Sequence, residues 1–80
     1  MYGDIDMDIR CNVAFFWDNE AEVWIATSED VPGLILEDES FDNLLDRVFV
    51  TIPDLLESKD TEHRKISVNC VASRYELVYT

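Results

Sequence analysis

Basic residues are scarce in this sequence, which has 6 lysines and arginines against 18 aspartates and glutamates among 80 residues. The formal net charge is -12, and neither lysine nor arginine occurs between Arg10 and Arg47, an interval that holds ten acidic residues. Such a surface repels nucleic-acid phosphates and anionic membranes, whereas it speeds encounter with basic proteins. We therefore expect no nucleic-acid binding by this chain alone and no membrane binding. The acidity serves either a basic partner or simply solubility.

Cysteine, glycine and long apolar runs are also scarce. Cys11 and Cys70 are too few for a disulfide framework, and the 2 glycines form no phosphate-binding loop. Residues 1–10 lack the apolar core of a signal peptide, and no apolar run is long enough to cross a membrane. The default expectation is a cytoplasmic protein with reduced thiols.

Residues for catalysis or metal binding are equally sparse. The single histidine, His63, falls in a polar connector, and no serine or cysteine is paired with a base in the way that nucleophilic catalysis requires. The run DIDMD at residues 4–8 resembles the start of a calcium loop, but Ile9 and Phe15 stand where such a loop needs glycine and glutamate. We expect no enzyme, no metal and no cofactor.

The apolar pattern predicts one small α+β domain over residues 1–80. Apolar residues alternate from Ile5 to Phe15, and shorter strands are expected over residues 23–27 and 34–37. A helix should begin after Ser40, with Pro53 kinking it or ending its regular part early. Its apolar stripe comprises Phe41, Leu44, Leu45, Val48, Ile52, Leu55 and Leu56. A last strand should run from Ile66 to Tyr79, with a bulge or bend near Ser73 and Arg74 where the apolar phase changes.

The order β-β-β-α-β constrains the topology. The final strand should lie parallel to the first and beside it, with one helix packed on a four-stranded mixed sheet. Cys11 and Cys70 are then expected as buried neighbours on the helix side. The other sheet face should be uncovered, which favours a homodimer or a partner protein. We expect it to carry Ala14, Phe16, Trp24, Val71 and Val78.

The same order opens the ribonuclease H fold, whose two-metal chemistry needs three or four converging carboxylates. The candidates are Asp6 or Asp8, the helix residue Asp46, and Glu76 on the last strand. Glu76 lies beyond the expected bulge, and basic groups that would hold a phosphate are few. A nuclease is therefore not favoured.

Residues 17–34 carry a more specific signal. The run WDNEAEVWIATSEDVPGL resembles the N-terminal pattern of the small HicB-like family, and DNLLDRVFVTIPDLLE at residues 42–57 resembles the helix that follows it. The resemblance covers about residues 7–57 and implies a partial ribonuclease H-like fold without a working active site. HicB-like proteins are antitoxins that cap small basic RNA-cleaving toxins of the HicA type. Many also carry a C-terminal DNA-binding module, and we expect none in residues 1–80.

The resemblance implies an inhibitor that occludes a HicA-like toxin through an acidic surface with aromatic anchors. We expect the contact residues to be Trp24, Glu29, Asp30, Val31, Pro32, Gly33 and Leu34. Two other readings stay open. Pro32 and Gly33 also suit an ordinary turn, and Trp24 also suits a core or dimer contact. The alternative function is a self-associating structural module without a toxin partner.

Overall fold

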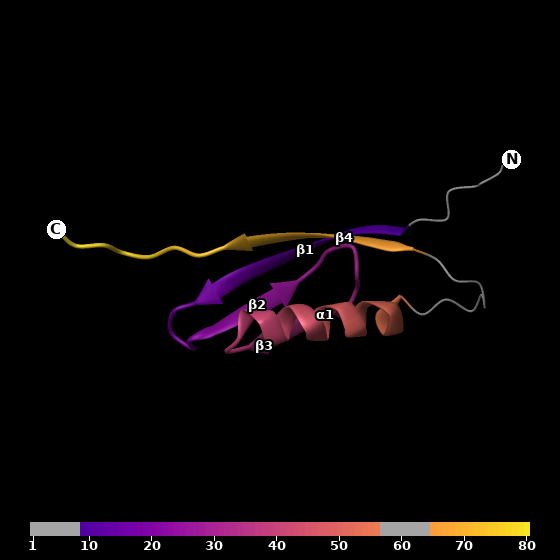
Figure 1. Ribbon diagram of the computed structural model, residues 1–80, viewed down its shortest axis with the longest axis horizontal. Helices are drawn as coiled ribbons and strands as arrows, with labels where there is room; N and C mark the ends of the chain where they lie inside the picture. The colour runs from indigo at the N-terminus through magenta and orange to yellow at the C-terminus, as the bar shows by residue number, and fades with distance from the viewer. Residues whose placement is uncertain (1–8, 57–64) are drawn as a thin grey trace, which may run out of the picture.

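The computed structural model describes residues 9–56 and 65–80, and it has one helix and four strands in the order β-β-β-α-β (Figure 1). The strands are β1 (Ile9–Asp18), β2 (Val23–Thr27), β3 (Ile35–Asp38) and β4 (Ile66–Ser73), and the helix is α1 (Phe41–Leu55). The expected fold class, one helix packed on a four-stranded mixed sheet, is confirmed.

The strands form one sheet in the order β3-β2-β1-β4. β1 pairs antiparallel with β2 and parallel with β4, and β2 pairs antiparallel with β3. The expected parallel pairing of the first and last strands is therefore confirmed. It follows because a helical crossover makes β4 parallel to β3, the strand before the helix. β3 in turn runs parallel to β1, since both are antiparallel to β2.

The helix begins as the sequence indicates. Ser40 is the N-cap, and its side chain accepts a hydrogen bond of 3.2 Å from the backbone N–H of Asn43. Pro53 lies in the last turn and α1 continues to Leu55, so the proline does not shorten the helix by a full turn. Its ring excludes a hydrogen bond to the carbonyl four residues earlier, which costs least near a helix end.

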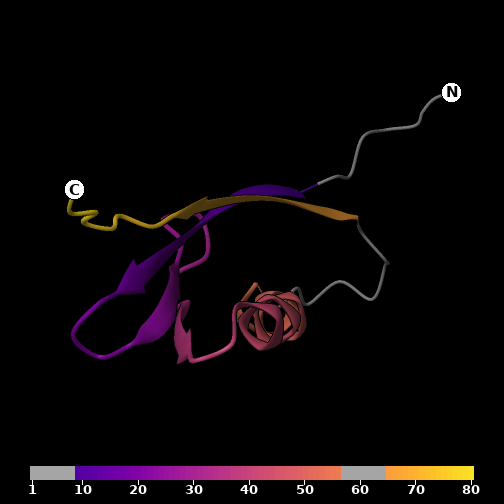
Figure 2. The same ribbon diagram turned by 60° about the vertical axis from the view of Figure 1, so that its left-hand side comes forward.

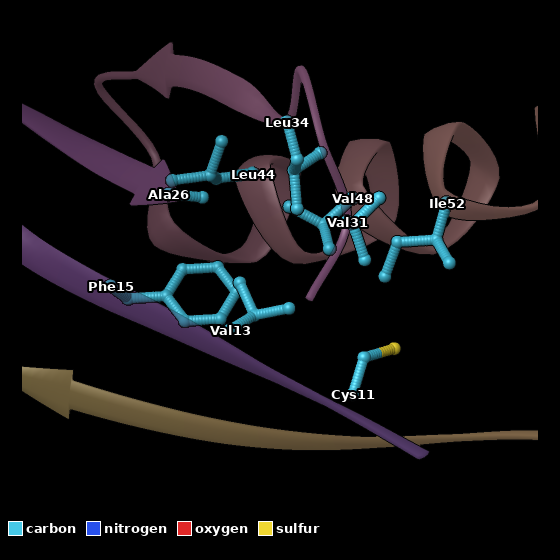
Figure 3. Packing of buried hydrophobic residues seen from close by; sticks show 9 residues of the cluster. All are labelled: Cys11, Val13, Phe15, Ala26, Val31, Leu34, Leu44, Val48 and Ile52. Carbon is cyan, nitrogen blue, oxygen red and sulfur yellow. The ribbon is translucent and has the colours of Figure 1, made fainter. Parts of the chain in front are cut away.

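The core lies between α1 and the sheet. Alternate residues of β1 point toward the helix and meet apolar side chains from α1 and from the loop before β3 (Figure 3). Phe15 is 1% exposed and packs edge-to-face on Phe41, with ring centroids 5.2 Å apart. The nine buried residues are Cys11, Val13, Phe15, Ala26, Val31, Leu34, Leu44, Val48 and Ile52.

The turn between β1 and β2 is closed by Asp18. Its carboxylate accepts hydrogen bonds from the backbone N–H groups of Glu20 and Ala21, at 2.9 and 3.2 Å. Glu22 completes the turn at φ 58°, a left-handed conformation that is unfavourable for a side chain with a Cβ. The polar segment DNEAE therefore sets the register of the hairpin, in which Trp17 faces Trp24.

The expected bounds of the last two strands need correction. β3 runs one residue later than expected, over Ile35–Asp38, and β4 ends at Ser73 instead of continuing to Tyr79. Residues 74–80 continue past the end of β4 and beyond the sheet, without strand pairing (Figure 1). The change of apolar phase near Ser73 thus marks the end of β4 and not a bulge within it, since the pairing with β1 stops at Phe16 and Ser73.

The position of α1 explains which side of the sheet is covered. α1 packs over β2 and β3, and in Figure 2, where α1 is seen nearly end-on, it lies on one side of the sheet. β4 is an edge strand that α1 does not cover. Cys11 is buried as expected, whereas Cys70 is exposed, which corrects the expectation of two buried thiols. Within the described residues, no helix is long and apolar enough to span a bilayer.

Candidate interaction surface

The sheet face opposite α1, which we call the open face, has no element over it in the described part of the chain (Figure 2). Apolar side chains are exposed on it. The register places two rows across it. One row runs Ile35, Thr27, Ala14 and Val71, and the next runs Glu37, Ile25, Phe16 and Ser73. Phe16 is 40% exposed, Val71 52% and Ile35 71%. An apolar band with a polar border is typical of a protein-binding surface.

A hollow of about 290 Å³ adjoins this band where the chain leaves β2. There the side chains of the loop take over the hydrogen bonds that a strand would make to β1. Asp30 accepts a bond of 2.7 Å from the backbone N–H of Asn12, and Ser28 donates one of 2.6 Å to the carbonyl of Asn12. The amide of Asn69 closes this end through a 3.0 Å bond to the side chain of Asn12. The hollow therefore has a mixed polar and apolar lining, and hydrogen bonds to Asn12 hold its loop against β1.

Residues Val31 to Leu34 form a tight turn after this loop. The N–H of Leu34 donates a 3.1 Å hydrogen bond to the carbonyl of Val31, Pro32 occupies the second position, and Gly33 has φ 87°. A turn with proline second and a positive φ at the third position has the type II pattern. The turn reading of Pro32 and Gly33, left open above, fits this geometry.

The expected contact residues therefore separate into two groups. Glu29, Asp30, Pro32 and Gly33 are exposed on the loop, where a partner can reach them. Val31 is 0% and Leu34 1% exposed, so both are core residues that anchor the loop and cannot present a contact surface in this conformation. The sequence signal for their burial was that both are apolar and flank Pro-Gly, because apolar residues beside a turn commonly pack into the core.

Trp24 also lies elsewhere than expected. It is opposite Trp17 on the helix side of the sheet, with ring centroids 5.6 Å apart, and 4.9 Å from Phe41. The guanidinium of Arg74 lies 4.3 Å from the ring centroid of Trp17 and 5.9 Å from that of Trp24. Trp24 thus belongs to an aromatic cluster beside the core, and the expectation that it lies on the uncovered face is wrong.

The residues that sequence reasoning missed are Ile25, Ile35 and Glu37. All three lie on the open face, in register with Phe16 or Ala14 through β2. Periodicity could not place Ile25, since Val23 to Ala26 is continuously apolar, and the four-residue strand that holds Ile35 and Glu37 is too short to show a clear period. The aromatic anchor available to a partner on this face is therefore Phe16.

The nuclease candidates do not come together. Asp46 is exposed on α1, and Glu76 forms an ion pair with Arg74 in residues 74–80. Asp6, Asp8, His63 and the DIDMD run lie outside the described residues. Among the residues that the structure does describe, no group of three His, Cys, Asp or Glu side chains could hold a metal ion.

The two thiols differ in environment although both have raised pKa values. Burial raises the pKa of Cys11 most, and the nearby charges of Asp30 and Cys70 raise it further. Burial also raises the pKa of Cys70, in spite of its exposed position. Both thiols are therefore protonated at neutral pH, which disfavours a nucleophilic or redox role.

In a Cys70→Ser variant, Cys11 is expected to react with a thiol reagent about 1000-fold more slowly in the native state than in urea, because reaction requires unfolding. The raised pKa adds a pH dependence. The folded state holds its thiol proton more tightly, so this contribution to stability is complete below the unfolded pKa and is lost as the pH rises through the raised folded value. Rapid native labelling at neutral pH would contradict the burial of Cys11.

Comparison with known proteins agrees with this architecture. The crystal structure of hypothetical protein TTHA1013 from the extremely thermophilic bacterium Thermus thermophilus matches with a TM-score of 0.69 and 35% identity, over 88% of this chain and 99% of that one. A comparison with curated proteins gives no match. The family model described as a domain of unknown function, DUF1902, matches residues 10–80. The chain therefore belongs to the DUF1902 family.

Proposed function

We propose that this protein is a HicB-like inhibitor that binds a small basic RNA-cleaving toxin of the HicA type and occludes it. The observation that carries the proposal is the open face, where Phe16, Ile35 and Val71 are exposed beside the carboxylates of Glu29 and Glu37. The similarity of residues 17–34 to the HicB-like pattern supplies the class of partner. No catalytic role is part of this proposal.

The charge distribution favours a basic partner over an acidic or neutral one. The loop at the border of the open face presents Glu29 and Asp30, and the chain as a whole carries a net charge of -12. An acidic surface accelerates encounter with a basic protein, and exposed apolar side chains at the centre supply the affinity once contact is made. A ribonuclease has a basic surface because it must bind phosphates.

The hollow beside the apolar band suits the same partner. It is lined by Glu29 and Asp30 together with the side chains of Asn12, Thr27 and Ser28. A lysine or arginine of the partner entering it would meet carboxylates and hydrogen-bond acceptors at the edge of the apolar band. Because one carboxylate oxygen of Asp30 already accepts from Asn12, Glu29 is the better candidate for a new ion pair.

We expect a tagged copy, expressed in the organism that encodes it, to retain one small basic protein in stoichiometric amount, identified by mass spectrometry. The purified partner should cleave RNA, and addition of this chain should silence the cleavage. Cells shown to make such a ribonuclease, in which the tagged chain retains no basic protein, would contradict the proposal. The alternative, a self-associating module without a toxin, would then be left.

A further inference from the structure

β4 is an edge strand with little protection. It pairs only with β1, and within residues 9–56 and 65–80 no strand covers its other edge. Six of its eight residues are exposed. Soluble proteins commonly block such an edge with a proline, a bulge or charged side chains, because its unpaired backbone groups can bind another strand. Residues 66–73 contain no proline and no charged residue, and their register with β1 is unbroken.

The hydrogen bonds of the sheet show which backbone groups of β4 face outward. The N–H of Ile9 donates a 2.8 Å bond to the carbonyl of Lys65, and Ile9 is in register with Ile66. In a parallel ladder alternate residues direct both backbone groups to the same neighbour, so the odd-numbered residues of β4 face β1. The N–H and C=O groups that point to the free edge are those of Ile66, Val68, Cys70 and Ala72.

The same chain is poorly placed to cover this edge with its C-terminal residues. A return along β4 would require a tight turn, yet residues 70–80 contain no glycine, proline, asparagine or aspartate. Arg74 stacks on Trp17, and the carbonyl of Tyr75 accepts a long 3.5 Å hydrogen bond from the amide of Asn19. Both contacts direct residues 74–80 past the end of β1 and away from the free edge of β4.

Charge favours a second copy of this chain as the occupant of the edge. Residues 65–75 include Lys65 and Arg74 but no acidic residue, although 18 of the 80 residues are acidic. Two copies with a net charge of -12 repel each other over most of their surface, and least along β4. Contact through the open faces would instead bring the carboxylates of Glu29 and Glu37 together. A basic protein would be drawn to those carboxylates and away from β4.

We propose that this protein forms a two-fold dimer in which β4 of one copy pairs antiparallel with β4 of the other, edge to edge. A two-fold axis normal to the sheet makes the two strands antiparallel and joins the two four-stranded sheets into one. The outward-facing backbone groups of β4 then bond to the same set in the other copy. Both α1 helices lie on one side of the joined sheet. Both open faces lie on the other side and stay available to the basic partner.

Sedimentation over a wide concentration range tests the proposal. The chain should sediment as a dimer of about 18.6 kDa, twice its 9.3 kDa mass. Cys70→Pro should raise the dimer dissociation constant by at least about 100-fold, because it removes an outward-facing N–H from each copy and leaves the bonds to β1 intact. Val71→Pro is the matched contrast, since its N–H faces β1. Where both variants are monomeric, Val71→Pro should have the lower urea midpoint.

A second pair of variants tests the edge through charge. Cys70→Asp should dissociate the dimer, because it places a carboxylate from each copy in the contact, whereas Val50→Asp, at a 69% exposed site on α1, should not. Circular dichroism checks that each variant is folded. A monomeric wild-type chain, or a dimer that survives both Cys70→Pro and Cys70→Asp, would overturn the proposal. Capture of the basic protein is measured separately through the open face, so failure of one proposal does not imply failure of the other.

Discussion

Phe15→Ala is expected to lower the free energy of unfolding by about 3–5 kcal/mol, whereas Phe16→Ala should lower it by less than about 1 kcal/mol. The two side chains are neighbours in sequence but lie on opposite faces of β1. Phe15 is 1% exposed in the core and Phe16 is 40% exposed on the open face. Truncating Phe15 leaves a cavity lined by side chains such as Phe41, which can relax only in part.

Urea denaturation followed by tryptophan fluorescence measures both losses, with protein concentration held fixed because a dimer makes stability concentration-dependent. A domain of this size is stabilised by about 4–12 kcal/mol in total, so Phe15→Ala should be close to unfolding. Equal losses for the two variants would mean that the open face is covered by another molecule. Such a result would argue against its availability to a basic partner.

Phe16→Asp is expected to weaken binding of the basic ribonuclease by about 100-fold or more, with a matching loss of inhibition. The substitution places a charge at the centre of the apolar band, where an aromatic anchor has been removed. Because Phe16 is partly exposed in the free protein, the fold should survive. Val50→Asp is the matched control, since it adds the same charge at an exposed site on α1 and should bind as the wild type does.

Surface plasmon resonance with the captured partner provides both the affinity and its salt dependence. The association rate of the wild type should fall as the ionic strength rises, because the carboxylates at the border act over a distance that salt screens. Unchanged binding by Phe16→Asp would exclude the open face as the docking surface.

The partner surface was less predictable from sequence than the fold. Of the expected contact residues, Glu29 and Asp30 are exposed, whereas Val31 and Leu34 are core residues. A linear motif contains buried residues that support a surface as well as exposed residues that make up that surface. The sequence does not distinguish the two. Only the packing of the turn against the core separates the two groups.

Trp24 illustrates a second kind of limit. The sequence VWIAT has no alternation, so the face of each residue depends on which residue of β1 it opposes. The turn closed by Asp18 places Trp24 opposite Trp17, and a shift of one residue would have reversed every side chain of β2. That register is a property of the hairpin geometry, which hydrophobic periodicity does not contain.

The sequence by itself determined the element order, the capped start of α1 and the alternation of β1, because these depend on local periodicity and on side chains next to the backbone groups that they bond. It also determined the parallel neighbour of β1, since a helical crossover allows little else. Only the tertiary structure decided that α1 covers β2 and β3 and leaves β4 free. Cys70 and residues 74–80 are exposed for that reason, because burial depends on contacts between segments that are distant in the chain.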